Sequence, residues 1–347
     1  MKRSRRRGVA LVLALWVLVL FSFVGLELST FSRADTGGAR YLKERLQAYY
    51  LARGGVERGI GLVNDYFRRY PANALAAKNL GRDLSTLKES RPPLLTWLAD
   101  RGLARVPLGA GSYSLRFEDL AARVNVNRTD PLVLANLIRL TGVDDARSRQ
   151  LADAVLDWVD ADDQHRPQGA ERDWYERHRL RPPRNGPVTQ LEELLLVKGM
   201  TRDILFGGER TKGLVPFLTT EGPGKINVNS APAEVLLAVP GLDQGTVSRI
   251  LSTRRTRSLR SLAEVLGADP EAQLGRNPVL GLLSFDTTEM AVEAQGMLAG
   301  APARSVVRAT VGVMPAGLVV RGWRDDFPSG LALAPASSAA DSTGPQS

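Results

Sequence analysis

Apolar residues dominate one stretch close to the N-terminus. Residues 9–28 read VALVLALWVLVLFSFVGLEL, and the 18 residues from 9 to 26 carry no charge. As an α-helix that rises about 1.5 Å per residue, they extend about 27 Å, close to the roughly 30 Å of a bilayer's hydrocarbon core. The eight residues before them include five basic side chains and no acidic one. By the positive-inside rule, this pattern predicts a membrane-spanning helix with its N-terminal end in the cytoplasm.

A second apolar pattern follows at three- and four-residue spacing, which is typical of one face of an amphipathic helix. Its members are Leu42, Leu46, Tyr49, Ala52, Val56, Ile60, Val63 and Phe67. The first proline is Pro71, so one long helix can include both patterns. The pairs at 37–38 and 54–55 are glycines, which cost about 1 kcal/mol each relative to alanine. We expect a bend or break near residues 35–38.

Alternating apolar and polar residues predict strands at both ends of the remaining chain. Residues 112–118 alternate in this way, and 284–294, 305–314 and 318–323 are rich in Val and Thr and separated by turn residues. Strands contributed from both ends imply one antiparallel sheet, with the middle of the chain inserted into it. Residues from 329 onward have no periodicity and are rich in Ala, Ser, Pro and Gly, which predicts disorder.

The inserted middle repeats itself. Residues 123–128, RVNVNR, return as KINVNS at 225–230, and each copy precedes an apolar helical segment. Gly142, Gly199 and Gly241 each stand between two such segments, where glycine supplies the left-handed conformation that ends a helix. Two all-helical modules of the SAM-like or helix-hairpin-helix-like kind are therefore predicted. The fold class is α+β, with a long N-terminal helix packed on a small antiparallel sheet and a large helical insertion.

The predicted divisions follow from these patterns. They are a leader at 1–8, a transmembrane helical part at 9–28, an amphipathic helix and the first part of the head at 29–122, helical modules at 123–215 and 224–283, C-terminal strands at 284–328 and a tail at 329–347.

The amino-acid composition limits the kinds of functional site that the chain can contain. The 347 residues carry a formal net charge of +9, but five of the positive charges lie in the leader, which leaves +4 for the rest. There is no cysteine, which excludes disulfide and thiolate chemistry. The two histidines, His165 and His178, lie in one Arg-rich segment, so a histidine-based triad or an ordinary zinc site is not expected.

The hairpin at residues 239–242, VPGL, is similar to the helix-hairpin-helix motif, whose backbone N–H groups can bind a DNA phosphate. Basic support would come from Arg249, Arg254, Arg255, Arg257 and Arg260. The alternative is that the hairpin is only a compact folding unit with a solvated basic face. Asp144, Asp145 and Asp243 at the hairpins would repel phosphate. No nucleic-acid partner is expected.

The densest acidic cluster runs from Asp157 to Asp173. With Asp160 as position one, Asp162 and Glu171 fall at positions 3 and 12, the spacing of the main acidic ligands of an EF-hand loop. His165 stands where such a loop requires glycine, so a true EF-hand is not indicated. Oxygen ligands gathered in this way suit Ca²⁺. A solvated acidic loop neutralised by nearby arginines, and an acid pair for hydrolysis, are the alternatives, although no nucleophile accompanies the pair.

Three interpretations fit the N-terminal segment. It can be a plain anchor, or a cleaved secretory signal with a site at residues 32–34. The third depends on Gly8, which lies between the basic and the apolar run. This arrangement resembles the signal of type IV pilins and type II secretion pseudopilins, which implies cleavage between Gly8 and Val9 by a prepilin peptidase and methylation of the new terminus. Pilins usually have glutamate at the fifth mature position, where this chain has Leu13.

The segments DWVDADD, GAERDWY, LEELLLVKGM and INVNSAPAEVL, together with Gly8 and Leu13, resemble the K-type minor pseudopilins of type II secretion. The resemblance implies a pilin-like head with a helical insertion that binds calcium. Candidate ligands are Asp160, Asp162, Asp163, Glu171 and Asp173, with Asp157 as an outer candidate.

The same resemblance implies the partners and the location. It implies a heterotrimer with the I- and J-type minor pseudopilins at the pseudopilus tip, and contacts with the major pseudopilin and the inner-membrane secretion platform. It also implies an anchor in the inner membrane and a head in the periplasm. A non-enzymatic assembly subunit is expected. A membrane-anchored DNA-binding protein for DNA uptake is the second candidate, and a membrane-tethered hydrolase is the third.

Overall fold

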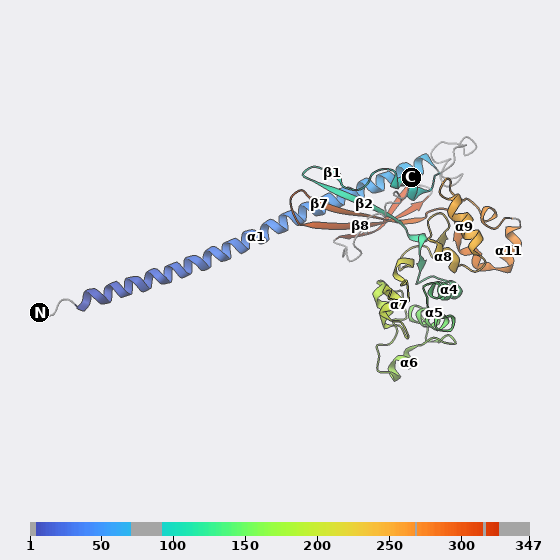
Figure 1. The fold of residues 1–347 in the computed structure, drawn as a ribbon, viewed down its shortest axis with the longest axis horizontal. Coiled ribbons are helices and arrows are strands. Elements are labelled where there is room, and N and C mark those ends of the chain that lie inside the picture. Colours follow the sequence, from blue (N-terminus) through green and yellow to red (C-terminus); the bar gives the residue numbers. More distant parts are fainter. Residues whose placement is uncertain (1–4, 71–91, 268, 315–316, 326–347) are drawn as a thin grey trace, which may run out of the picture.

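One helix begins the chain and extends far beyond the rest of the molecule (Figure 1). The computed structural model describes residues 5–70, 92–267, 269–314 and 317–325, with side chains in the first helix from 12 to 24 and from 38 onward. Helix α1, Arg5–Arg69, has 65 residues and continues through residues 35–38. The break expected there is therefore wrong. Each glycine lowers the stability of the helix by only about 1 kcal/mol relative to alanine, and the hydrogen-bonded turns on either side compensate for this loss.

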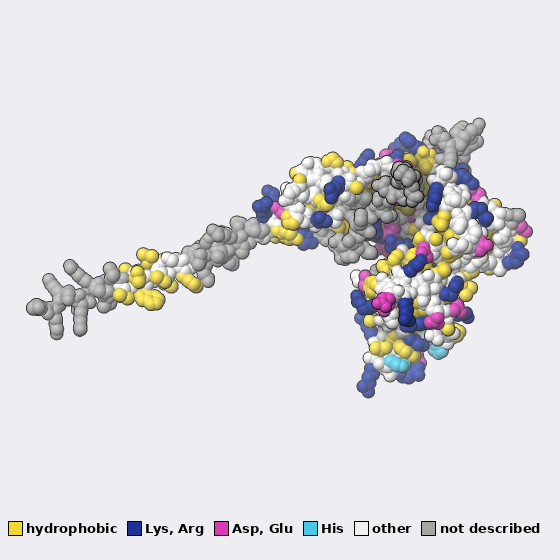
Figure 2. Space-filling view, in the orientation of Figure 1, with side chains coloured by type: hydrophobic (Ala, Val, Ile, Leu, Met, Phe, Trp, Pro, Cys, Tyr) yellow, Lys and Arg dark blue, Asp and Glu magenta, His cyan; other side chains and the backbone are white. Residues whose placement is uncertain are grey.

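The apolar N-terminal part of α1 stands free of the rest of the structure. The side chains of residues 12–24 are all exposed. Figure 2 shows the apolar ones on the visible face of the helix. Within the described residues, no helix contains an apolar stretch long enough to cross a membrane. Part of the predicted span at 9–28 has side chains that the structure does not describe, and so has the predicted cleavage site at Gly8 and Val9. The predicted tail at 329–347 lies entirely outside the described residues.

A five-stranded antiparallel sheet packs against the C-terminal half of α1. Its order is β1-β2-β7-β8-β9, which confirms that both ends of the chain build one sheet. The strands are β1 Val106–Leu108, β2 Gly111–Asp119, β7 Glu289–Leu298, β8 Arg304–Met314 and β9 Gly317–Asp325. Helix α1 covers one face of β2, β7 and β8, and the short helix α3, Leu94–Ala99, completes this core.

Small residues let α1 approach the sheet closely. Ala48 and Ala52 are fully buried against β7, and a Cβ on Gly296 would lie 2.0 Å from the carbonyl oxygen of Ala48. On the helix side, a Cβ on Gly55 would lie 2.8 Å from the Tyr113 ring and 2.9 Å from Ala294. Gly55 is therefore required at this contact because a larger residue would push the helix away from the sheet.

The helical insertion consists of two units that are built alike. The first contains β3 Val124–Asn125, α4 Pro131–Leu140, α5 Asp145–Val159, α6 Arg172–Arg177, η3 Leu191–Leu196, α7 Arg202–Phe206, η4 Val215–Phe217 and β4 Leu218–Thr219. The second contains β5 Ile226–Asn227, α8 Ala233–Ala238, α9 Gln244–Thr253, α10 Leu262–Leu266, α11 Pro270–Arg276, η5 Pro278–Leu282 and β6 Leu283–Ser284. In each unit the first and last strands pair in parallel, so the unit closes on itself. Both share one apolar core, and the α+β fold with a helical insertion is confirmed.

The repeated VN pairs close these units. The Asn127 side chain donates to the carbonyls of Val188 and Thr220 at 2.9 and 3.0 Å and accepts from the Val188 N–H at 2.8 Å. Asn229 makes the matching bonds to Leu259 and Phe285, at 2.8 to 2.9 Å. Each asparagine thus satisfies backbone groups of two distant segments of its own unit. This explains the repeat that the sequence displays.

The insertion is joined to the sheet by buried polar contacts. Asp119, at the end of β2, is fully buried and accepts hydrogen bonds from Asn227 at 2.7 Å and from Ser230 and Thr287 at 2.8 Å. The pKa of its carboxyl is nevertheless raised, because the loss of solvation on burial outweighs these bonds. One side chain therefore connects the sheet, the second unit and the segment that returns to the sheet.

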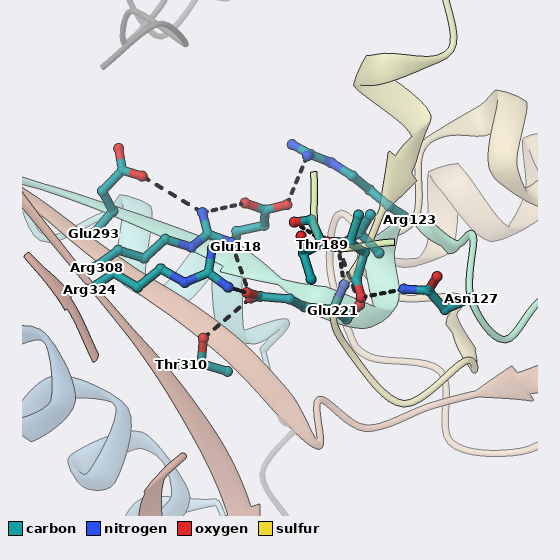
Figure 3. Close-up of polar contacts among 11 residues, drawn as sticks. Glu118, Arg123, Asn127, Thr189, Glu221, Glu293, Arg308, Thr310 and Arg324 are labelled. Carbon is teal, nitrogen blue, oxygen red and sulfur yellow. Dashed lines mark hydrogen bonds and ion pairs between the residues drawn. The ribbon is translucent and has the colours of Figure 1, made fainter. Parts of the chain in front are cut away.

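A charged layer lies on the sheet face opposite α1 (Figure 3). Arg308 on β8 contacts Glu118 at 3.3 Å, Glu293 at 3.7 Å and Glu221 at 4.0 Å, and Arg324 on β9 also pairs with Glu221. Glu221 belongs to the segment between the two helical units. The network therefore docks the centre of the insertion on the sheet.

A matched pair of substitutions tests the close helix-to-sheet contact. Gly55→Ala should lower the free energy of unfolding by about 1–3 kcal/mol, because its methyl group overpacks the contact with Tyr113 and Ala294. Gly61→Ala in the same helix has no atom within 4 Å of its added Cβ and should raise stability by about 0.5–1 kcal/mol. Denaturant unfolding of both variants measures this. Changes of the same sign would contradict the packing argument.

Candidate metal centre

The acidic loop begins where α5 ends. Asp157 lies in the last turn of α5 and is fully buried, and Asp160 is the capping residue at which the backbone turns to an extended conformation. The Arg166 guanidinium donates to Asp157 at 2.7 Å and to Oδ2 of Asp160 at 2.5 Å, and the Arg166 backbone N–H also points at the Asp157 carboxylate. These bonds fold the loop back over the helix end. Gly169 permits this, since a Cβ there would lie 1.9 Å from Oδ2 of Asp157.

The folded loop brings three carboxylates together. Asp160, Asp162 and Glu171 each place an oxygen so that the three atoms lie within 4.8 Å of one another. Calcium binds oxygens at about 2.3–2.6 Å, so ligands on opposite sides of one ion are roughly 4.6–5.2 Å apart. The three oxygens are therefore close enough to share a single ion.

Several buried oxygens at this site have no hydrogen-bond donor among the described residues. They are Oδ1 of Asp160, both Oε atoms of Glu171 and Oδ1 of Asn185. Glu171 is only 2% exposed, and leaving such an acceptor unpaired costs about 1–3 kcal/mol or more for a charged group. A bound cation would satisfy these atoms. The residues present therefore fit a hard, oxygen-preferring divalent ion such as Ca²⁺.

Asn185 is a residue that the sequence analysis missed. Its amide nitrogen donates to the Asp162 carbonyl and to Oδ1 of Asp163, both at 2.9 Å, while its own Oδ1 stays buried and unpaired. It adopts a left-handed backbone with φ of 49°, which asparagine tolerates better than most residues. The Asn-Gly pair at 185–186 marks a turn in the sequence, but it does not indicate which loop that turn would meet.

The electrostatics of the cluster favour a cation. The pKa of Glu171 is raised from its ordinary 4.5 to about 7, first because burial removes solvation and then because Asp157, Asp160, Asp163 and Asp162 are negative. Arg166 neutralises the side of the cluster formed by Asp157 and Asp160. The Glu171 side has no such partner among the described residues, so excess negative charge is concentrated there.

Two other predicted ligands make different contacts. Asp163 accepts the hydrogen bond from Asn185, and Asp173 lies on α6, where it pairs with Arg177 at 2.8 Å with both side chains more than 60% exposed. Neither belongs to the group of three oxygens. Tyr175 is not a free nucleophile either, because burial raises its pKa to about 12 and its hydroxyl accepts the Lys198 N–H at 2.9 Å.

Three of the five arginines predicted to support DNA binding make contacts within their own unit, whereas Arg255 and Arg260 are exposed. Arg254 donates to the carbonyls of Val228 at 3.0 Å and Ala231 at 2.6 Å, Arg249 donates to Val265 at 3.1 Å, and Arg257 pairs with Glu264. Asp243 caps α9 by accepting the Thr246 N–H at 2.7 Å, and this bond lowers its pKa. These three arginines and Asp243 therefore stabilise the folding unit itself.

The fold defines a class of protein with one long N-terminal helix packed on an antiparallel sheet that carries a large helical insertion. Comparison with known proteins places the chain within this class. The sequence model described as type II secretion system (T2SS), protein K, matches residues 115–207, and a second model of the same description matches residues 226–284. The chain is therefore similar to the type II secretion system protein K family over most of both helical units.

Two relatives are similar to the chain. Type II secretion system protein K of Dickeya chrysanthemi is 28% identical over 152 residues, which is 42% of this chain and 40% of that protein's length. The match thus spans less than half of the curated relative. The crystal structure of the GspK-GspI-GspJ complex from the enterotoxigenic Escherichia coli type 2 secretion system contains a chain with a TM-score of 0.56 and 16% identity, over 85% of this chain and 98% of that one. This similarity supports the fold.

The raised pKa of Glu171 predicts a pH dependence in the absence of a metal ion. A carboxyl whose folded pKa is raised favours folding most below its unfolded pKa, near 4.5, and this contribution is lost as pH rises through about 7. In chelator, the melting temperature should therefore fall between pH 5 and pH 8. Glu171→Gln should flatten this fall and melt higher than the parent at pH 8, whereas Asp173→Asn should melt as the parent does. An unchanged pH profile in Glu171→Gln would contradict the assignment.

Proposed function

We propose that this chain is a minor pseudopilin, a non-enzymatic subunit that helps to initiate or cap a type II secretion pseudopilus. The observation that carries the proposal is the architecture, in which a long helix leaves an α+β head enlarged by two helical units. The similar solved structure from Escherichia coli is a complex of GspK with GspI and GspJ. By analogy, this chain assembles with the corresponding two minor pseudopilins and contacts the major pseudopilin and the inner-membrane platform of the secretion system.

The apolar part of α1 serves in this proposal as a single inner-membrane anchor with the head in the periplasm. The exposed apolar side chains from residue 12 to 24 surround the helix, as lipid contact requires. The basic residues before them favour retention of that end in the cytoplasm. A prepilin peptidase cuts between Gly8 and Val9, and the mass of the mature chain would report this.

Leu13 favours a position at the filament end. A carboxylate inside a membrane helix costs about 2.5–3.5 kcal/mol on insertion scales, so it is retained where a neighbouring charge compensates for it. Pilins use the fifth mature residue to pair with the amine of an adjacent subunit. Leu13 offers no such pairing, and the bulk of the insertion hinders stacking within a helical shaft. Both features suit a subunit at the tip.

Assembly with the minor pseudopilins tests this function. The full-length protein, co-expressed with the I- and J-type subunits of the same secretion system and extracted in detergent, should purify as a 1:1:1 complex. Fibres that contain a labelled copy should carry it once, at one end. The major pseudopilin is the control bait and should not replace either minor subunit. A chain recovered alone, or labelled copies spaced along the shaft, would reject the proposal.

The acidic loop is proposed as a calcium site. Asp160, Asp162 and Glu171 would hold the ion, with Oδ1 of Asn185 as a further candidate ligand. The four unpaired buried oxygens support this assignment. A bound Ca²⁺ supplies positive charge without chemical reactivity, so its role is structural. It would fix the loop between α5 and α6 and relieve the repulsion around Glu171.

Calcium should stabilise the folded protein measurably. A ligand that binds only the folded state adds about 2.7 kcal/mol when its concentration is a hundred times Kd. The melting temperature should rise with Ca²⁺ and return in chelator. Asp160→Asn and Glu171→Gln should remove most of the rise, whereas Asp173→Asn, whose carboxylate pairs with Arg177, should keep it. An equal loss in all three variants would indicate only general electrostatic attraction.

A further inference from the structure

Lys198 lies in a tight turn between η3 and α7, in the first helical unit. The residues around it anchor this turn. Val197 and Met200 are buried in the apolar core of the helical units, and the Met200 N–H donates to the Val197 carbonyl at 3.0 Å. Gly199 completes the turn with φ of 80°, a conformation that glycine adopts without strain. The Lys198 side chain therefore extends from a well-fixed backbone.

From this turn, the Lys198 side chain reaches the acidic loop. Its Nζ donates to the carbonyl oxygen of Gly169 at 2.9 Å and to that of Gln168 at 3.4 Å. Gly169 is the residue that lies tightly against the Asp157 carboxylate, where a Cβ would not fit. Among the described residues, the Lys198 ammonium forms no ion pair with a carboxylate. Its contacts with the loop are therefore to the backbone.

The same residue also contacts α6. The Lys198 backbone N–H donates to the Tyr175 hydroxyl at 2.9 Å, and its ammonium lies 5.1 Å from the centroid of the Trp174 ring. The N–H groups of Trp174 and Tyr175 in turn donate to the Glu171 carbonyl at 2.9 and 3.3 Å. Glu171 thus lies between two segments that Lys198 holds, one at 168–169 and the other at the first turn of α6.

We propose that Lys198 is a positioning residue of the calcium site, which holds Glu171 beside Asp160 and Asp162. This inference rests on the calcium site proposed above. The carboxylate of Glu171 accepts no hydrogen bond from the described residues, so its place depends on the backbone on either side of it. Groups that hold metal ligands in place without touching the metal typically change metal affinity by about 10- to 100-fold when they are removed.

The sign of the effect on calcium affinity separates positioning from charge. A lysine near the site repels a cation, so the loss of its charge alone would make calcium bind more tightly. Lys198→Met removes the charge and both hydrogen bonds of Nζ but keeps an unbranched apolar stem beside Trp174. If Lys198 positions Glu171, this substitution should instead make calcium bind more weakly. The two explanations therefore predict changes in opposite directions.

Calorimetric titration of the full-length protein in detergent with Ca²⁺ tests the proposal. Lys198→Met should raise Kd for calcium by about tenfold or more relative to the parent. Lys198→Arg keeps a positive charge and hydrogen-bond donors, and it should recover most of the lost affinity. Lys212→Met is the charge-matched control, because Lys212 belongs to the same helical unit but pairs with Glu234 at 3.2 Å. This control should bind calcium at least as tightly as the parent does.

Equal or tighter calcium binding by Lys198→Met, or an equal loss in Lys212→Met, would overturn the role of Lys198 without affecting the calcium assignment. A parent protein that binds no calcium would reject the calcium site and this inference with it. If Lys198→Met melts far below the parent in chelator, Tyr175→Phe decides the question. It removes the hydroxyl that accepts the Lys198 N–H and changes no charge near pH 7. Weaker calcium binding by this variant supports the proposal, and unchanged binding rejects it.

Discussion

The pairing of β2 with β7 is the constraint on which the rest of the molecule depends. Asp119, the last residue of β2, lies opposite Met290 at the start of β7, although 170 residues of chain separate them. The insertion must therefore leave and re-enter the sheet at nearly the same point. Closing so long a loop carries an entropic cost, which contacts at its base must offset. Asp119 provides such contacts by accepting hydrogen bonds from Asn227, Ser230 and Thr287.

Each half of the insertion solves the same closure problem on a smaller scale. In each unit, the first short strand pairs in parallel with the strand that ends the unit. One asparagine side chain, Asn127 or Asn229, also bonds the backbone just after that last strand and the backbone of a segment in the middle of the unit. Parallel pairing of two residues alone is weak, so the side-chain bonds and the shared apolar core hold each unit together. The segment between the units then rests on the charged face of the sheet through Glu221. The insertion is in this way attached at its base and at its centre.

The candidate metal centre depends on this scaffold. The α5 helix is buried along one side, and this fixes Asp157 and the direction in which the chain leaves at Asp160. Arg166 then returns the loop onto the helix end, and Glu171 lies buried at the residue before α6, without a capping hydrogen bond from its side chain. The carboxylates thus sit close together without being fully neutralised by the protein. Repulsion of this kind persists only where packing elsewhere stabilises it, and it is relieved when a cation binds.

Local pattern by itself determined the long helix, the strands at both ends, the duplicated helical units and the place of the acidic loop, because these follow from periodicity and turn residues within short windows. It wrongly predicted a break near residues 35–38, since propensity is a weak prior within a long helix. It also treated Gly55 as a weak point, although the contact with Tyr113 requires it. Only the tertiary structure decided that Asp160, Asp162 and Glu171 converge while Asp173 pairs with Arg177, and that Asn185 joins the loop. The physical reason is that convergence and burial depend on which distant segments pack together, and a one-dimensional spacing does not contain that information.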